Sequence, residues 1–264
     1  MRLHMSLEGE VAVVTGGGQG IGQQIAFRLA QEGATVVIAD VNEKGSVETA
    51  ETILKNYGEK AKVIPTDITR EEEVTRLIDS TFAIAHKIDI LVNNAGITGP
   101  MKGIEEIELA EWEATMAVNL RGMFLCCKHT VPIMKRQERG SIINIASMSG
   151  KRPLAQRTPY TTSKMGVIGF TRTLAAEVGR WKIRVNSLCP GAVAGPRYDA
   201  VVEGIMKHSG KTREQVISEW GEASALKTFV DPKYVAGVVA FLCSEDAAMM
   251  TGQDINVSAG MVMY

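Results

Sequence analysis

The feature that most constrains the fold is an alternation of short apolar runs with longer amphipathic stretches along most of the chain. Strands that are apolar throughout are buried on both faces, which is typical of a parallel sheet covered by helices on both sides. The expected strands are Val11–Thr15, Thr35–Ala39, Lys62–Pro65, Ile88–Val92, Ser141–Ala146, Ile183–Leu188 and Asp254–Val257. The expected helices are Ile21–Gln31, Glu43–Tyr57, Glu71–His86, Leu109–Arg136, Ser163–Arg180 and Pro232–Ser244.

The pattern contains no linker, low-complexity segment or internal repeat. We therefore expect one α/β domain over residues 1–264, a Rossmann-type doubly wound parallel sheet of about seven strands. The least regular stretch, residues 192–229, follows the sixth expected strand, at the end of the sheet where α/β proteins bind ligands. A mobile substrate loop and a plain surface excursion are both open interpretations of this stretch.

Charge and cysteine content exclude several classes of protein. The 29 Lys and Arg residues are balanced by 30 Asp and Glu residues, so we expect neither nucleic acid nor an anionic membrane as a partner. No apolar run approaches the roughly 18 residues of a membrane span, and the first ten residues lack the apolar core of a secretion signal. Four cysteines without a CxxC pair predict reduced thiols. Together these features predict a cytoplasmic protein.

A glycine cluster, TGGGQGIG at residues 15–22, joins the first expected strand to the first expected helix. Glycines permit a tight turn and let backbone N–H groups approach a diphosphate at a helix N-terminus. The glycines Gly16, Gly20 and Gly22 have the spacing Gly-x-x-x-Gly-x-Gly. Glycines also end strands without binding anything, but the position between a strand and a helix favours a nucleotide site.

The residue that closes the second expected strand is Asp40, 18 residues beyond Gly22. A carboxylate at this place accepts hydrogen bonds from the adenosine ribose hydroxyls and repels a 2′-phosphate. The first basic residue after it is Lys44. We therefore predict NAD as the cofactor, with NADP less favoured. A turn-forming role for Asp40 beside Asn42 is the alternative interpretation.

Further motifs follow in order along the chain. They are NNAG at residues 93–96, Asn119, Ser147, YTTSK at residues 160–164, and Pro190 with Gly191. Together with the glycine turn they cover about 175 residues and resemble the short-chain dehydrogenase/reductase family, including its gaps of 13 from Ser to Tyr and four from Tyr to Lys. The resemblance implies an NAD(P)-dependent oxidoreductase for alcohols or ketones, commonly a homotetramer, with a homodimer as the alternative.

Tyr160 and Lys164 lie one helical turn apart, so their side chains share a face. A phenol is a weak base near neutral pH, and a neighbouring ammonium favours its phenolate form. Tyr160 is therefore predicted to accept the proton in alcohol oxidation and donate it in carbonyl reduction, with Ser147 holding the substrate oxygen. The resemblance implies that Lys164 also binds the nicotinamide ribose and that Asn119 holds a water linking Lys164 to solvent. A lone Tyr-x-x-x-Lys is otherwise a surface pair.

The resemblance also assigns the cofactor surface, with Asp67 and Ile68 at the adenine and Pro190–Val193 at the nicotinamide. The predicted cofactor-binding residues are Gly16, Gln19, Gly20, Ile21, Gly22, Asp40, Asp67, Ile68, Asn94, Ala95, Gly96, Tyr160, Lys164, Pro190, Gly191 and Val193. Gly195 stands where the family often has a Thr, so that contact is not carried over. Hydride transfer needs no metal, and no pattern with metal-ligand spacing occurs, so we predict no metal site.

Three arginines fall near the expected pocket rim: Arg152, Arg157 and Arg197. A guanidinium suits planar recognition of a carboxylate and can likewise hold a sulfonate or phosphate. We predict Ser147, Arg157 and Arg197 as substrate-binding residues. An anionic group on a small hydroxy or keto substrate is one interpretation; solvated arginines or an ion pair between subunits is the other.

The predicted activity is hydride transfer between NAD and a small secondary alcohol or ketone, such as a polyol, hydroxy acid or sulfonated alcohol. The alternative enzyme is an NADPH-dependent 3-oxoacyl-[acyl-carrier-protein] reductase, against which Asp40 and Gln19 argue because neither is basic. A nucleotide-binding regulatory protein without catalysis is the alternative from another class. The apolar C-terminal tail, SAGMVMY, is open to a subunit contact or to packing within the chain.

Overall fold

The computed structural model describes residues 6–58 and 60–264, without the side chains of Pro196, Arg197, Ala200 and His208. Seven parallel strands form one sheet in the order β3-β2-β1-β4-β5-β6-β7. Their bounds are β1 Val11–Thr15, β2 Thr35–Ala39, β3 Ala61–Val63, β4 Ile90–Asn93, β5 Gly140–Ile145, β6 Ile183–Pro190 and β7 Asp254–Val257. The order reverses between β1 and β4, so the predicted doubly wound α/β fold is confirmed.

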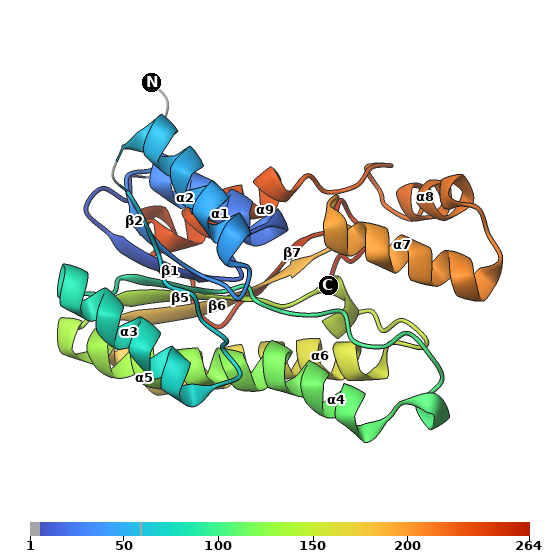
Figure 1. Cartoon of the computed structure of the whole chain (residues 1–264), viewed down its shortest axis with the longest axis horizontal. Helices are drawn as coiled ribbons and strands as arrows, with labels where there is room; N and C mark the ends of the chain where they lie inside the picture. Colours follow the sequence, from blue (N-terminus) through green and yellow to red (C-terminus); the bar gives the residue numbers. More distant parts are fainter. Residues whose placement is uncertain (1–5, 59) are drawn as a thin grey trace.

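Helices cover both faces of the sheet (Figure 1). Helices α1, α2 and α9 lie on one face, and α3, α4, α5 and α6 lie on the other. The bounds are α1 Gly20–Gln31, α2 Glu43–Tyr57, α3 Glu71–Ala85, α4 Leu109–Met116, α5 Gly122–Gln137, α6 Thr158–Val178, α7 Pro196–Ser209, α8 Arg213–Glu222 and α9 Pro232–Cys243. Because successive strand residues point to opposite faces, Val13 packs toward α3 and α5 while Val14 packs toward α1 and α9.

Two helices differ from the sequence prediction. The single helix expected over Leu109–Arg136 is divided into α4 and α5 by a π-helical turn, Ala117–Arg121. The chain stays helical from α4 through this turn into α5, so the sequence was interpreted as one helix. Helix α6 begins at Thr158, five residues earlier than expected, because Pro159 occupies the first turn, where the missing N–H is not needed.

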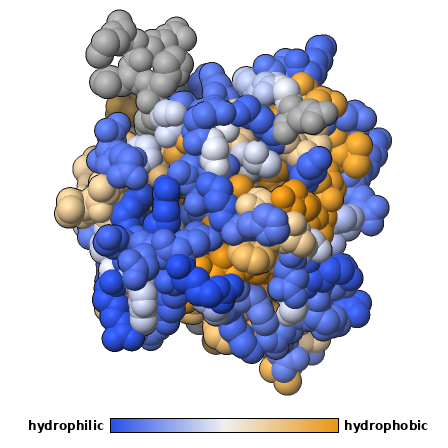
Figure 2. Space-filling view, turned by 90° about the vertical axis from the view of Figure 1, so that its left-hand side faces the viewer, coloured by the Kyte–Doolittle hydropathy of each residue, from blue (hydrophilic) through white to orange (hydrophobic). Residues whose placement is uncertain are grey.

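The irregular stretch 192–229 contains α7 and α8, which project from the sheet at the carboxyl end of β6 (Figure 1). The opposite side of the molecule is largely hydrophilic around a central apolar area (Figure 2). Within the residues that the structure describes, no helix is long and apolar enough to cross a membrane. Burial raises the pKa of the Cys127 thiol to about 12 and that of Cys189 to about 11, so these thiols behave as core groups.

Candidate active site

A cavity of about 690 Å³ opens at the carboxyl ends of the strands, within the size range of small-molecule sites. Every residue predicted to bind the cofactor lines it, apart from Lys164. Ser147 and Arg157 also line it, whereas Asn119 lies buried outside the cavity lining. The side chain of Arg197, predicted to bind substrate, lies outside those that the structure describes.

The glycine turn lies so close to the loop after β4 that side chains do not fit between them. At Gly22 an added Cβ atom would be 2.0 Å from the Gly16 oxygen and 2.4 Å from Asn94 Nδ2. At Gly16, where φ is +66°, it would be 2.8 Å from Ala95 Cα. The glycine turn and the start of α1 line the cavity, and the N–H groups at a helix N-terminus suit a diphosphate.

The loop after β4 is fastened to the glycine turn by hydrogen bonds. Asn94 Nδ2 donates to the oxygens of Thr15 at 3.0 Å and Gly16 at 2.9 Å. The backbone N–H groups of Asn94 and Ala95 donate to Thr15 Oγ1 at 3.0 and 3.1 Å. The Asn94 amide thus holds the turn in shape, a role that the sequence analysis did not assign to it.

Asp40 stands at the outer end of the same turn. Its Oδ2 accepts a hydrogen bond from the Gly18 N–H and its Oδ1 accepts one from the Asn42 N–H, each at 2.9 Å. Asp40 therefore both shapes its loop, as the turn-forming alternative supposed, and presents a carboxylate to the cavity. The nearby Lys44 is 88% exposed and does not line the cavity.

Tyr160, Lys164 and Ser147 meet at the end of β5. The Lys164 Nζ atom lies 5.9 Å from the centroid of the Tyr160 ring and donates to the Ile145 oxygen at 2.8 Å. Ser147 Oγ accepts from the Ser149 N–H at 3.1 Å and so caps the one-turn helix Met148–Gly150. Tyr160 and Ser147 are each 8% exposed and line the same cavity.

Asn119 lies in the π-helical turn and is 2% exposed. Its Oδ1 accepts from the Ile97 N–H at 2.8 Å, and its Nδ2 donates to the Ile97 oxygen and to Ser163 Oγ, each at 3.0 Å. A Cβ atom added at Gly96 would lie 3.0 Å from Asn119 Oδ1 and 3.6 Å from Lys164 Nζ. Asn119 therefore joins the loop after β4 to α6 beside the lysine; its water-holding role stays a prediction.

Of the arginines expected at the rim, Arg157 is buried instead. It is 4% exposed, its guanidinium carbon lies 4.7 Å from the Tyr160 ring centroid, and Nη2 donates weakly to the Thr98 oxygen at 3.4 Å. The interpretation of a solvated arginine is therefore wrong for Arg157. Arg152 is exposed and does not line the cavity.

The sequence analysis missed two aromatic residues that line the cavity, Tyr198 in α7 and Trp220 in α8. Their ring centroids are 5.9 Å apart, and Tyr198 also lies 4.9 Å from Phe229. The sequence did contain an indication of them, because all three aromatic residues lie within the stretch 192–229, which was interpreted as a possible substrate loop. Periodicity alone did not indicate that they face one another.

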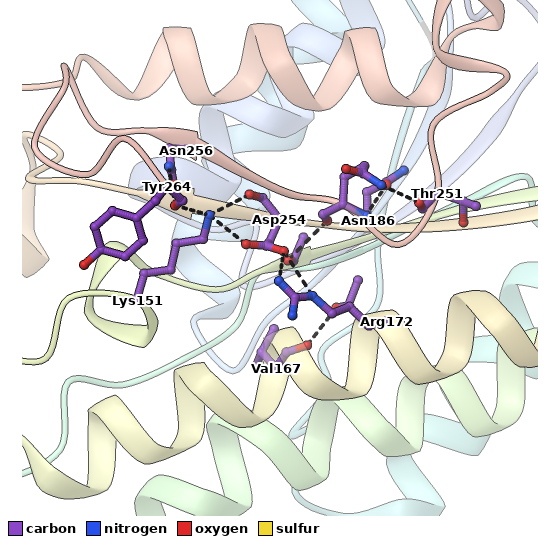
Figure 3. Close-up of polar contacts among 11 residues, drawn as sticks. Lys151, Val167, Arg172, Asn186, Thr251, Asp254, Asn256 and Tyr264 are labelled. Atoms are coloured by element: carbon purple, nitrogen blue, oxygen red, sulfur yellow. Dashed lines mark hydrogen bonds and ion pairs between the residues drawn. The ribbon is translucent and has the colours of Figure 1, made fainter.

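Asp254 in β7 contacts side chains from two other segments, Lys151 and Arg172 (Figure 3). Lys151, which follows the helix capped by Ser147, contacts Asp254 Oδ2 at 2.6 Å and donates to the Tyr264 oxygen at 2.8 Å. Arg172 in α6 contacts Asp254 Oδ1 at 2.5 Å. Burial acts to raise the pKa of Asp254, but hydrogen bonds from Lys151 and Arg172 outweigh it and lower that pKa. The C-terminal tail thus contacts its own chain.

This chain is similar in sequence to known proteins over nearly its whole length. A family model described as enoyl-(acyl carrier protein) reductase matches residues 16–262. The short chain dehydrogenase/reductase astE of Aspergillus oryzae is 38% identical over 257 residues, which cover 97% of this chain and 96% of the relative. The 3-oxoacyl-[acyl-carrier-protein] reductase FabG of Aquifex aeolicus is 36% identical over 259 residues, which cover 98% of this chain and all of the relative (100%).

Solved structures match over nearly the whole length as well. The crystal structure of NAD+-bound xylitol dehydrogenase has a TM-score of 0.93 at 30% identity and covers 96% of this chain and 99% of that chain. A crystal structure of actinorhodin polyketide ketoreductase with NADPH also has a TM-score of 0.93, at 33% identity and 100% coverage of both chains. By sequence and by fold, this chain belongs to the short-chain dehydrogenase/reductase family.

Proposed function

We propose that this protein is an oxidoreductase that transfers a hydride between NAD(H) and a small secondary alcohol or ketone, with Tyr160 as the acid/base catalyst. The observation that carries the proposal is that Ser147, Tyr160 and the glycine turn line one cavity, with the Lys164 Nζ atom 5.9 Å from the Tyr160 ring centroid. A cavity lined in this way accommodates a dinucleotide and a small substrate side by side.

NAD(H), when bound, would supply the hydride acceptor for oxidation and the hydride donor for reduction, and the chain supplies the proton chemistry. Ser147 Oγ donates a hydrogen bond to the substrate oxygen and holds it beside the phenolic oxygen of Tyr160. In oxidation, Tyr160 accepts the hydroxyl proton; in reduction it returns that proton to the carbonyl oxygen. The hydrogen bond to the Ile145 oxygen fixes the Lys164 ammonium, whose Nζ atom lies 5.9 Å from the centroid of the Tyr160 ring.

Preference for NAD over NADP rests on Asp40. Its carboxylate faces the adenosine end of the cavity, and among the described lining residues no Lys or Arg lies there to neutralise a 2′-phosphate. The xylitol dehydrogenase structure contains NAD+ and the ketoreductase structure contains NADPH, so the shared fold does not distinguish the two cofactors. The proposed preference for NAD therefore depends on Asp40.

The second candidate function is reduction of 3-oxoacyl thioesters on a carrier protein, and the relative from Aquifex aeolicus favours it. Asp40 weighs against the NADPH-dependent form of that reaction, as it did in the sequence. Turnover of a 3-oxoacyl thioester with NADPH exceeding that of every small alcohol or ketone with NAD(H) would favour the thioester reductase.

We also propose that the chain assembles as a homotetramer, or as a homodimer, in the reducing cytoplasm. Phe124 in α5 is 45% exposed and Met165 in α6 is 52% exposed, and apolar side chains of this size suit a contact between subunits. The four cysteines are free thiols, as a reducing compartment maintains them. Light scattering should give about four times, or twice, the 28.5 kDa mass of one chain.

The experiment that tests the proposed reaction is the substitution Tyr160→Phe, which removes the phenolic oxygen and keeps the ring. Polyols, hydroxy acids and sulfonated alcohols are each supplied with NAD or NADP, and the absorbance of the reduced cofactor is followed. We expect kcat to fall by about 10²- to 10⁴-fold while NAD binding is retained. Tyr234→Phe, at a tyrosine that is 61% exposed and outside the cavity lining, is the control. Unchanged turnover in Tyr160→Phe would remove the catalytic assignment.

A further inference from the structure

Charged side chains divide the cavity into two halves. At the adenosine end the lining includes the carboxylates of Asp40 and Asp67. At the other end, beside Tyr160, Arg157 is the one charged side chain among the lining residues that the structure describes. A ligand that extends from the glycine turn to Tyr160 therefore meets negative charge first and positive charge last.

Arg157 is held at a defined place relative to the predicted reacting oxygen. Its guanidinium stacks over the face of the Tyr160 ring at 4.7 Å from the centroid, and Nη2 points to the Thr98 oxygen at 3.4 Å. The residue is the N-terminal flanking residue of α6, the helix that also carries Tyr160 and Lys164. A substrate whose oxygen lies at the Tyr160 hydroxyl consequently has the groups two or three bonds away within reach of this guanidinium.

The wall contributed by α7 and α8 adds a second donor. Among the described residues, the Tyr198 hydroxyl is buried and has no hydrogen-bond partner. Leu154, Val201 and Trp220 also line the cavity. Buried hydroxyl groups normally have a partner, and apolar walls strengthen an ionic contact by excluding water. A polar group on a ligand bound in the cavity can supply the partner that the Tyr198 hydroxyl lacks.

From these observations we propose that Arg157, assisted by the Tyr198 hydroxyl, forms an oxyanion subsite for the substrate. The subsite takes the carboxylate, sulfonate or phosphate group of a small secondary alcohol or its ketone. A guanidinium presents N–H donors in a planar fork that matches two oxygens of such a group. The inference rests on the proposed function, because it is the reacting oxygen at Tyr160 that places the anionic group at Arg157.

The first experiment measures binding and requires no turnover. Malonate, sulfoacetate and inorganic phosphate are titrated into the NAD-saturated protein at constant ionic strength, and melting temperature and calorimetric affinity are recorded. Arg157→Gln removes the charge, Arg157→Lys keeps the charge without the fork, and Arg152→Gln is the matched control at an exposed arginine outside the lining. Melting in the absence of ligand establishes that each variant is folded.

We expect at least one of the three anions to bind the wild-type protein and Arg152→Gln equally. Arg157→Gln should weaken its binding by about 10- to 100-fold, and Arg157→Lys and Tyr198→Phe should weaken it by less. The anion with the largest loss identifies the head group. Equal binding to all variants, or saturable binding of none of the anions to wild type, overturns the inference.

The second experiment compares turnover of each anionic alcohol with a neutral alcohol of the same carbon skeleton. Arg157→Gln should lower kcat/KM for the anionic member by about 10- to 100-fold more than for the neutral member, mainly through KM. Equal losses on both members contradict the anion subsite and leave the oxidoreductase proposal intact. Absence of NAD binding, or undiminished turnover in Tyr160→Phe, counts against the proposed function instead, so the two failures are distinguishable.

Discussion

At the scale of single residues, the position of each charge along the cavity decides what can bind where. Asp40 has one carboxylate oxygen on the Gly18 N–H and the other on the Asn42 N–H, so the group is fixed in direction before any ligand arrives. Arg157 is fixed in a similar way by the Tyr160 ring at the other end. The fixed carboxylate of Asp40 predicts which cofactor the protein prefers, and substitution of Asp40 tests that prediction.

Replacing Asp40 should change the preference between the two cofactors. The substitution Asp40→Ser removes the repulsion of a 2′-phosphate, and the added substitution Val41→Arg supplies a cation, since Val41 is 71% exposed and lines the cavity. We expect the ratio of kcat/KM for NAD to that for NADP to fall by about 10- to 100-fold, because charged hydrogen bonds contribute ~1.5–3 kcal/mol. Steady-state kinetics with both cofactors measure the ratio. An unchanged ratio would contradict the role given to Asp40.

At the scale of elements, the site depends on close approach between the turn after β1, the loop after β4 and the start of α6. Asn94 and Asn119 hold these segments together, since the side chain of each forms hydrogen bonds with a segment distant in the sequence. Glycines allow the approach sterically. Replacing a glycine by alanine at a crowded and at an uncrowded position therefore tests whether the site requires this close approach of the backbone.

Gly22→Ala should disrupt the turn, because its Cβ atom would overlap the Gly16 oxygen at 2.0 Å. We expect a loss of stability of about 1–3 kcal/mol and at least tenfold (~1.4 kcal/mol) weaker NAD binding. Gly169→Ala in α6 is the control, since no atom lies within 4 Å of the added Cβ and alanine favours a helix by up to ~1 kcal/mol. Urea unfolding and NAD titration measure both effects. Similar behaviour of the two variants would contradict the packing argument.

At the scale of the whole molecule, the cluster around Asp254 connects regions that the chain separates widely. Asp254 lies near the end of the sequence, Lys151 follows the Ser147 loop, and Arg172 belongs to the helix of Tyr160 (Figure 3). The same lysine also contacts the oxygen of Tyr264, the last residue. The last strand and the C-terminal tail therefore contact the segment that follows Ser147 and the helix that carries Tyr160.

Asp254→Asn should destabilise the protein by about 1–3 kcal/mol, because hydrogen bonds to an ionised group are lost. The pKa of Asp254 is lowered in the folded protein, so its contribution is complete above its unfolded value of 3.8 and disappears as the pH falls through the lower folded value. The difference in unfolding free energy between wild type and variant should be constant from about pH 5 to 8 and shrink below about pH 4. Urea unfolding at several pH values measures it; a difference that grows toward acid would contradict the assignment.

Much of this architecture was predictable, because it depends on relations between residues close in sequence. Continuous apolar runs located the strands, and the sheet buries the central strands on both faces as expected, whereas the edge strands β3 and β7 are less buried. The glycine turn and the spacing of Tyr160 and Lys164 are equally local, since one helical turn places residues four apart on one face. The motifs therefore placed the glycine turn, Asp40, Ser147 and Tyr160 at the cavity, and the family resemblance supplied the other predicted cofactor-binding residues that line it.

What only the tertiary structure decided are contacts whose partners lie far apart along the chain. Whether Arg157 meets solvent or the Tyr160 ring, and whether Tyr198 and Trp220 face the cavity, depends on how α6, α7 and α8 pack together. The bonds of Asn119 to Ile97 and of Lys151 to Asp254 are of the same kind. Sequence periodicity assigns a residue to a face, but its neighbour across that face is set by the simultaneous packing of every element, so these contacts followed only from the folded chain.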